Sequence, residues 1–378
     1  MASVIVFGPT GQIGSVTART AADQGAKVWL AMRDTNKAIP GLGEDLEKAG
    51  AFHRAQADLQ QPDTVSKAVR TSGAKRAFVY LAHGSPDHMK ATFEALKSAG
   101  IEFAVFLSSF TIHTDKGLRD IPASEAIPYV HAQAEANLDA VFGPDQYVAI
   151  RPGAFATNLL EQRKGIAAGQ VSLYGGEFQQ DNITPEDIGR VSGNVLVSGP
   201  RNRQRKVYLY GPEILSLRDS IVRIGRMLDR DVDVTALGRK EAWDKYISYG
   251  LPEFFADYMV DVLSTKGRDK GLGELFPKYE EGVNNVKLYT GRPSTSLEDW
   301  DQYANFRYSD GHAESDLPHV APTADARAQM LEDYEKVILV TGATESLEGH
   351  LRYHLAKSDD VQTVVCLSRE TRNDAGTR

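Results

Sequence analysis

The stretch that decides the fold stands at the start of the chain: Ser3-Val4-Ile5-Val6-Phe7-Gly8-Pro9-Thr10-Gly11-Gln12-Ile13-Gly14. Residues 3–7 are apolar and rich in β-branched side chains, and they predict a short strand. A helical pattern follows from Ser15 to Gln24, Gly25 ends it, and Lys27 to Met32 predicts a second strand. Strand, glycine turn, helix and strand in this order predict a β-α-β unit.

Three glycines of this stretch, Gly8, Gly11 and Gly14, have separate uses. One lets the backbone turn tightly, one lets it approach a pyrophosphate, and one lets the helix pack closely on the strand. The helix N-terminus adds free N–H groups and the positive end of a dipole. We therefore expect a dinucleotide to contact Gly8, Thr10, Gly11, Gln12, Ile13 and Gly14. The alternative is a glycine turn that serves packing alone.

The same alternation continues along the first half of the chain. Strands are expected at 77–81, 103–107 and 147–150, and helices at 88–99 and 129–142. Short apolar strands that alternate with helices predict an α/β fold with a doubly wound parallel sheet covered on both faces. Residues 1–155 are thus interpreted as the dinucleotide-binding portion.

After residue 155 aromatic residues become denser and longer helical patterns appear. We interpret 156–309 as a smaller, mixed α/β, substrate-side portion, 310–325 as a linker, and 326–378 as a separate segment. Four aromatic residues in the second portion are interpreted as core rather than as a stacking cage: Tyr246, Tyr249, Phe254 and Tyr258.

Composition excludes several classes of protein. The 378 residues are 42% hydrophobic and 25% charged, which is typical of a globular protein. Cys366 is the one cysteine, so a disulfide framework is excluded, and the nine scattered histidines predict no metal site. A net charge of −8 argues against nucleic acid as the partner, and the basic run 201–206 is interpreted as a solvated turn. No apolar stretch is long enough to span a membrane and no signal peptide is evident, so we expect a cytoplasmic protein.

The end of the second strand bears on the type of dinucleotide. Arg33 follows this strand and Lys37 lies four residues on, a pattern that suits a 2′-phosphate and favours NADP(H). Asp34 is the counter-indication, because a carboxylate there suits the free ribose hydroxyl of NAD. Asp58 and Leu59 are expected at the edge of the adenine pocket, although Asp58 alternatively caps a helix that begins near residue 62.

Seven motifs share their order with a known family. They are the Gly8–Gly14 turn, Arg33, Asp58-Leu59, Phe106-Leu107-Ser108-Ser109, Arg151-Pro152-Gly153-Ala154-Phe155, Thr184–Gly189 and Thr290–Asp299. On these motifs, residues 3–306 resemble the NmrA-like atypical short-chain dehydrogenases, a group with isoflavone-reductase-like and quinone-reductase-like enzymes. The resemblance implies a Rossmann fold that binds NADP(H). It does not fix an activity, because the family also contains redox-sensing regulators.

The C-terminal segment resembles a different group. Val337 to Thr344, Leu351 to Leu355 and Val361 to Arg369 look like the opening of a thioester-reductase domain, which terminates polyketide and peptide synthetases. Glu345 and Glu348 stand where glycines are expected, and a carboxylate there repels a pyrophosphate. We interpret 326–378 as a truncated β-α-β remnant that binds no second cofactor, and as a hint of natural-product biosynthesis.

The usual catalytic pattern of short-chain dehydrogenases, Tyr-x-x-x-Lys, is missing from the expected helix. In one register Tyr129 is followed by Gln133 at the lysine position; in the other, His131 stands at that position and Ile127 at the tyrosine position. A glutamine supplies no charge, whereas a histidine supplies one at least partly. Tyr129 and His131 therefore both remain candidates for the proton donor, with Ser108 as the third catalytic candidate.

The missing pattern limits the chemistry. Unactivated ketones need an acid as hydride arrives, whereas quinones, conjugated enones and iminium ions need less help. We therefore expect an NADPH-dependent reductase of a small conjugated or aromatic carbonyl, quinone or iminium substrate. A non-catalytic dinucleotide sensor and a redox-neutral enzyme on the same fold are the alternatives. The sequence does not fix the oligomeric state.

The remaining site residues follow apolar strands, where doubly wound folds bind ligands. Near the cofactor we expect Ala82, His83, Gly153 and Phe155, and near the substrate Phe110, His113, Asn158 and Leu159. The alternatives are a loop cap for Ser108 and an exposed loop for His113.

Overall fold

A sheet of seven parallel strands forms the centre of the chain. The structure is a computed structural model, and it describes residues 2–112, 117–264 and 272–300. The strand order is β3-β2-β1-β4-β5-β6-β9, and each neighbouring pair is parallel. The strands are β1 (Ser3–Phe7), β2 (Lys27–Met32), β3 (Phe52–Gln56), β4 (Arg76–Tyr80), β5 (Phe103–Leu107), β6 (Tyr147–Pro152) and β9 (Lys206–Leu209). The expected Rossmann-type α/β fold is confirmed.

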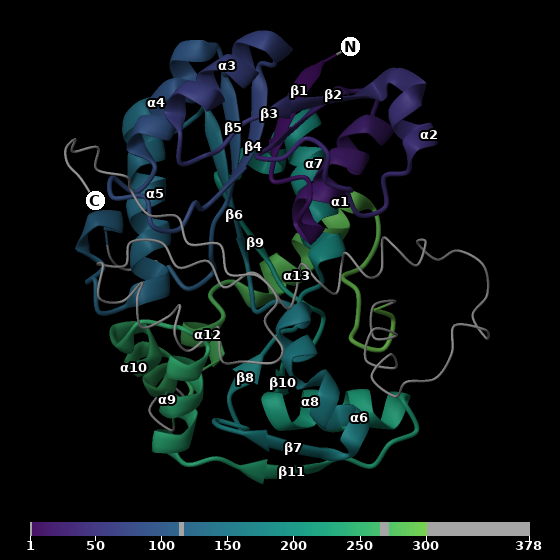
Figure 1. Ribbon diagram of the computed structural model, residues 1–378, viewed down its shortest axis with the longest axis vertical. Helices are drawn as coiled ribbons and strands as arrows, with labels where there is room; N and C mark the ends of the chain where they lie inside the picture. The colour runs from purple at the N-terminus through teal and green to yellow at the C-terminus, as the bar shows by residue number, and fades with distance from the viewer. Residues whose placement is uncertain (1, 113–116, 265–271, 301–378) are drawn as a thin grey trace, which may run out of the picture.

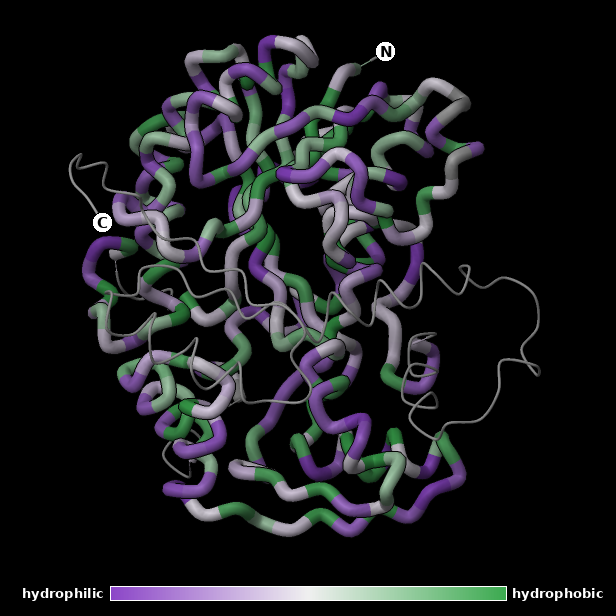
Figure 2. Tube along the Cα trace, viewed as in Figure 1, coloured by the Kyte–Doolittle hydropathy of each residue, from purple (hydrophilic) through white to green (hydrophobic). Residues whose placement is uncertain are grey.

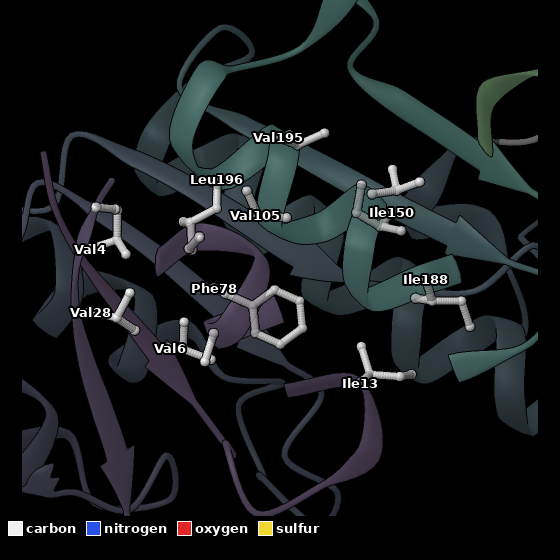
Figure 3. Close-up of a cluster of buried hydrophobic side chains, with 14 of the residues drawn as sticks. Val4, Val6, Ile13, Val28, Phe78, Val105, Ile150, Ile188, Val195 and Leu196 are labelled. Atoms are coloured by element: carbon white, nitrogen blue, oxygen red, sulfur yellow. The ribbon is translucent and has the colours of Figure 1, made fainter. Parts of the chain in front are cut away.

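Helices cover both faces of this sheet (Figure 1). One face carries α3 (Pro62–Ser72), α4 (Lys90–Ala99) and α5 (Ala126–Phe142); the other carries α1 (Gln12–Asp23), α7 (Pro185–Ser198) and α13 (Tyr279–Thr290). Figure 3 shows Ile13 of α1 and Ile188 of α7 beside Phe78 of the sheet. Apolar residues concentrate along the central strands in Figure 2, as expected for strands buried on both faces.

The second portion has a core of its own below the main sheet (Figure 1). It contains two small sheets, β7 (Gln170–Leu173) with β11 (Asp233–Ala236) and β8 (Gln179–Gln180) with β10 (Leu215–Ser216). Its helices are α6 (Arg163–Ala168), α8 (Leu217–Met227), α9 (Arg239–Ser248), α10 (Glu253–Val262) and α12 (Leu272–Leu275). The chain returns from here to the main sheet, because β9, α7 and α13 all come after residue 155.

Local sequence patterns predicted the bounds of several helices and strands in the first half to within a few residues. β1, β2 and β5 have the expected bounds, and α1 begins three residues earlier than expected. The helix expected from His88 begins only at Lys90, because His88 and Met89 have φ of 50° and 66° in the left-handed region. Five further short helical segments lie along the chain: α2 (Glu44–Leu46), η1 (Glu47–Ala51), η2 (Leu118–Asp120), η3 (Ala156–Gln162) and η4 (Arg201–Arg203).

Two expectations for the second portion need comment. Tyr249 and Phe254 are 44% and 64% exposed, so the prediction that they belong to the core was wrong. Both lie at or beside the ends of α9 and α10, whose packing against each other leaves these ring positions outside. The expected linker 310–325 and segment 326–378 lie outside the described residues. Among the helices that the structure describes, none is long and apolar enough to span a bilayer.

Candidate functional site

The turn between β1 and α1 lies where the strand order reverses. β1 pairs with β2 on one side and with β4 on the other, and ligands of doubly wound folds bind at such a point. Gly8 has a φ of +69°, and its N–H donates to the carbonyl of Ala31 over 3.1 Å. An added Cβ on Gly14 would lie 2.1 Å from the carbonyl oxygen of Gly8. Both glycines are therefore required by the backbone path itself.

The N-terminus of α1 is the second feature of this turn. Gly11 is its N-cap residue, and no side chain caps the helix there. The first N–H groups of a helix have no carbonyl partner within the helix, and the first turn of a helix is therefore a common place for a phosphate to bind. The side chain of Ile13 is buried in the core, and that residue can contribute to such a site only through its backbone. The turn thus fits a dinucleotide pyrophosphate.

The residues expected around the adenosine ribose form an exposed rim. Arg33, Asp34 and Lys37 are exposed at the end of β2, and the Asp34 carboxylate accepts the N–H of Asn36 over 2.9 Å within its own turn. Asp58 accepts the N–H of Gln60 in the same manner.

The alternative reading of Asp58 as a helix cap was wrong. The N-cap residue of α3 is Gln61, and its side chain makes no cap hydrogen bond. Leu59 is buried beneath the rim, and its carbonyl accepts the Thr92 hydroxyl over 2.7 Å. The Leu59 side chain is therefore packed beneath the expected adenine pocket and does not form its exposed edge.

Tyr80 belongs to this rim, although the sequence did not single it out. Its ring packs over the open side of Gly8 and remains 39% exposed. Burial raises the pKa of Tyr80, the charge of Arg33 lowers it, and the charge of Asp58 raises it. Tyr80 thus lies close to Arg33, expected at the 2′-phosphate, and to Asp58, expected at the edge of the adenine pocket. The sequence feature that could have identified Tyr80 is its position as an aromatic residue at the end of β4.

The loop after β4 is fixed by contacts from distant parts of the chain. The N–H of Ala82 donates to Sδ of Met89, and the carbonyl of His83 accepts from the Gln60 side chain over 2.7 Å. Asn137 donates to the carbonyls of Asp87 and His88 over 2.9 and 3.0 Å. These bonds hold the left-handed backbone at His88, and they place His83 on the exposed side of the loop.

Ser108 belongs to a buried network behind the strand ends. Its hydroxyl donates to Glu135 over 2.5 Å, and Glu135 receives Nε and Nη2 of Arg151 over 2.9 and 2.6 Å. Nη1 of Arg151 donates to the hydroxyl of Tyr208 over 2.9 Å. Glu135 and Arg151 have no solvent exposure. Burial alone would lower the pKa of Arg151, but the Glu135 carboxylate raises it above its ordinary value. The hydroxyl proton of Ser108 is therefore committed to a carboxylate.

His131 lies one helical turn before Glu135 and is partly buried. Its Nδ1 is buried and has no hydrogen-bond partner in the described part of the chain, and its ring lies 6.5 Å from that of Phe106. Burial, His83 and Arg151 lower the pKa of His131 to about 3. The expectation that this histidine supplies part of the lysine charge was therefore wrong, because the imidazole is neutral at physiological pH.

Tyr129 lies away from that network. Its ring meets the ring of His88 edge-on at 5.3 Å, and the Tyr129 hydroxyl lies 3.5 Å from Nε2 of His88. It packs with Ile112 and Ile121 in a small cluster beside the loop. Ser108 and Tyr129 share no hydrogen-bond partner, so the described structure does not assemble them as a catalytic pair.

Asp181 holds together the carboxyl ends of β6 and β9. Its carboxylate accepts the N–H groups of Ala154 and Gly211 over 2.8 and 2.9 Å and lies against Gly153. Burial raises the pKa of Asp181 to about 7, while its backbone N–H partners favour the ionised form. Phe155 follows on the same segment and bridges to Ile183. Gly153 and Phe155 are thus fixed at the expected end of the sheet.

The four residues expected to face the substrate do not share one environment. Phe110 stacks on Phe276 at 5.7 Å and joins an aromatic cluster, and Asn158 is exposed. Leu159 is 1% exposed and packs in the second core with Ile166, so the expectation that it faces substrate was wrong. It lies in η3, whose turn directs it inward. His113 lies outside the described residues.

Within the described ranges, no group of three or more His, Cys, Asp or Glu side chains is placed to hold a metal ion.

Comparison with known proteins agrees with this geometry. Residues 8–197 match the family of NAD(P)H-binding domains. The chain is 35% identical over 327 residues to a nitrogen metabolite regulation-like protein, bik4, of Gibberella fujikuroi, across 81% of this chain and 98% of that protein. It is also 48% identical over 58 residues to the non-reducing polyketide synthase fsr1 of the same organism, which is 15% of this chain and 2% of the synthase. The NADPH complex of an Escherichia coli quinone oxidoreductase has the same fold, with a TM-score of 0.61, 18% identity, and coverage of 80% of this chain and 99% of that one.

Proposed function

The chain belongs to the NmrA-like atypical short-chain dehydrogenase/reductases, and from this premise we propose that it is an NADPH-dependent reductase of a small conjugated or aromatic acceptor. The acceptor classes are a conjugated carbonyl, a quinone and an iminium ion. One observation carries the proposal: a histidine stands at position 131 in place of the lysine of typical members of the wider family, and its Nδ1 is buried with no hydrogen-bond partner among the described residues.

The cofactor contacts in this proposal come from the glycine turn, from the end of β2 and from the end of β6. Gly8, Gly11 and Gly14 bring the backbone to the pyrophosphate, and the first turn of α1 donates its N–H groups. Arg33 meets the 2′-phosphate, with Lys37 on the same exposed segment. The segment with Gly153 and Phe155 meets the nicotinamide end, where Asp181 keeps it in place.

The candidate proton donors then limit the class of substrate. When bound, NADPH supplies a hydride, and the acceptor also needs one proton unless it was cationic. Ser108 has its hydroxyl directed to Glu135, and Tyr129 lies against His88. Acceptors whose reduced form is a delocalised anion take their one proton later from water, and an iminium ion gives a neutral amine that needs none. The site thus suits quinones, enones and iminium ions, and it does not suit simple ketones.

Two similarities support parts of this proposal. The Escherichia coli protein of the same fold is described as a quinone oxidoreductase that uses NADPH, and a quinone is one of the acceptors that we propose. The 58-residue similarity to a polyketide synthase supports a substrate drawn from natural-product biosynthesis, where aromatic and quinonoid compounds are common products.

The test is an acceptor series with the purified full chain and NADPH. Loss of NADPH absorbance is followed with a naphthoquinone, a conjugated enone, a cyclic iminium ion and an unactivated cyclic ketone. We expect turnover with at least one of the first three and none with the ketone. Equal turnover of the ketone would show that the site does supply a proton donor, which contradicts the proposed choice of substrate. Failure of all acceptors would contradict the reductase function.

A second candidate function is a dinucleotide sensor that regulates another protein. The name of the Gibberella fujikuroi relative, a nitrogen metabolite regulation-like protein, favours it, and so does the enclosed proton network. The two functions differ in one measurement. A sensor binds NADP⁺ at least as tightly as NADPH and reduces no acceptor, whereas a reductase binds NADPH more tightly and turns over.

A further inference from the structure

Arg54, in the middle of β3, ties three segments of the chain together. Its Nε and Nη2 donate to the two carboxylate oxygens of Glu47 over 2.8 and 2.5 Å. Its Nη1 donates to the carbonyls of Thr35 and Lys37 over 2.6 and 2.7 Å. One guanidinium thus joins β3, the turn η1 and the loop that follows β2. A planar fork of donors makes such multiple bonds possible, and lysine does not reproduce them.

The loop that Arg54 holds is the one that carries Arg33. Thr35 and Lys37 lie two and four residues after Arg33, and the loop closes on itself through two bonds of Asp34. The Asp34 carboxylate accepts the N–H of Asn36 over 2.9 Å, and the Asp34 carbonyl accepts the N–H of Lys37 over 3.4 Å. Arg54 supports this turn through the carbonyls of its residues 35 and 37.

The charge of Arg54 is not itself available to a ligand. Both oxygens of Glu47 neutralise it, and the two side chains are only 26% and 22% exposed. Hydrogen bonds from Arg54 to Glu47 keep the pKa of Arg54 above its ordinary value, although its partial burial opposes this. Arg54 therefore acts on the rim through the backbone of residues 35–37.

We propose that Arg54 is a positioning residue that sets the preference of this protein for a 2′-phosphorylated dinucleotide. The inference rests on the proposed use of NADPH. Ordering a flexible loop costs backbone entropy, and a loop that is already ordered spares the ligand that cost. NADPH uses the loop through Arg33, whereas NADH has no phosphate to place there. Loss of the brace therefore weakens NADPH binding and leaves NADH binding nearly unchanged.

The experiment compares two ligands that differ only in the 2′-phosphate. Calorimetric titration of the full chain gives Kd for NADPH and for NADH in wild type, Arg54→Met and Arg54→Lys. We expect Kd for NADPH to rise about tenfold in both variants, and Kd for NADH to change less than about twofold. Glu47→Gln removes the carboxylate without altering β3, and we expect a smaller rise, about threefold, again confined to NADPH.

Two controls define the meaning of each result. Arg33→Met, which removes the proposed phosphate ligand, should show the same selective loss. Arg223→Met removes an arginine that is likewise held by carboxylates, Glu213 at 2.5 Å and Glu298 at 3.0 Å, but remote from this loop. It should change neither Kd. Thermal unfolding of each variant identifies any that fail to fold.

Several outcomes would overturn the inference. An equal rise in Kd for both dinucleotides in Arg54→Met means that Arg54 only stabilises the fold. An unchanged Kd for NADPH means that the loop holds its position without the brace. Wild type that binds both dinucleotides equally refutes the NADPH preference on which the inference rests. Wild type that prefers NADPH but reduces no acceptor refutes the reductase proposal alone, because the readout here is binding.

Discussion

The ring of Tyr80 occupies the space that a side chain on Gly8 would need. Cε1 of Tyr80 lies 2.5 Å from the position of an added Cβ on Gly8. Gly8 follows β1 and Tyr80 ends β4, so the two residues meet where the strand order of the sheet reverses. The dinucleotide turn and the aromatic rim are therefore coupled, because a change in either residue displaces the other.

Gly8→Ala tests this coupling. The φ of +69° strains any other residue, at about 1–3 kcal/mol, and the new methyl group collides with Tyr80. We expect lower thermal stability and a rise of at least about tenfold in Kd for NADPH, measured by calorimetry. Gly25→Ala is the matched control, because Gly25 has a φ of +78° and no atom within 4 Å of an added Cβ. It should lose stability and keep its affinity; an equal loss of affinity would contradict the steric explanation.

Tyr80→Ala addresses the role of the ring itself. Tyr80 is partly exposed between Arg33 and Asp58, where an adenine would stack on it. Stacking of a base on an aromatic side chain contributes about 1–3 kcal/mol, so we expect Kd for 2′,5′-ADP to rise roughly tenfold. Tyr80→Phe keeps the ring and should bind within about twofold of wild type. If Tyr80→Ala binds 2′,5′-ADP normally, the ring serves only to pack on the turn.

The sequence specified the glycine turn and several strands because these depend on neighbouring residues. An apolar β-branched run such as residues 3–7 forms a strand locally, and the glycines that follow are required by the turn that they form. The late start of α4 depends instead on Asn137, whose amide holds the carbonyls of Asp87 and His88 from a distant helix. No local pattern contains that information.

The site was less predictable than the fold for the same reason. The low pKa of His131 depends on its burial and on the neighbouring His83 and Arg151, which come from distant parts of the sequence. Leu159 looked like a substrate residue because it follows a strand end, yet the second core buries it. Arg54 carried no motif at all, since its function depends on carbonyls of the loop after β2.

The buried pair Glu135–Arg151 should dominate the stability of the strand ends. Removal of one partner leaves an uncompensated buried charge, which costs about 3–5 kcal/mol. We therefore expect Arg151→Met to lower the free energy of unfolding in urea by that amount. Ser108→Ala, which removes one bond to the same carboxylate, should lower it by about 1–3 kcal/mol. Arg223→Met breaks partly exposed ion pairs and should cost less than about 1 kcal/mol. Similar losses in all three variants would contradict the assignment of a buried network.

His131 should leave a signature in the pH dependence of stability. The folded chain binds a proton at His131 only near pH 3, whereas the unfolded chain binds it near the ordinary pKa of 6.5. Below pH 6.5 the unfolded state therefore binds more protons, and His131 lowers the free energy of unfolding by about 1.4 kcal/mol per pH unit as the pH falls toward 3. His131→Asn and His131→Phe do not titrate, so both should lose less stability than wild type between about pH 7 and pH 5 in urea unfolding. Two variants of different shape separate this slope from any packing cost, which is independent of pH. If both follow the wild-type slope, folding does not lower the pKa of His131, and the imidazole is not held neutral by its surroundings.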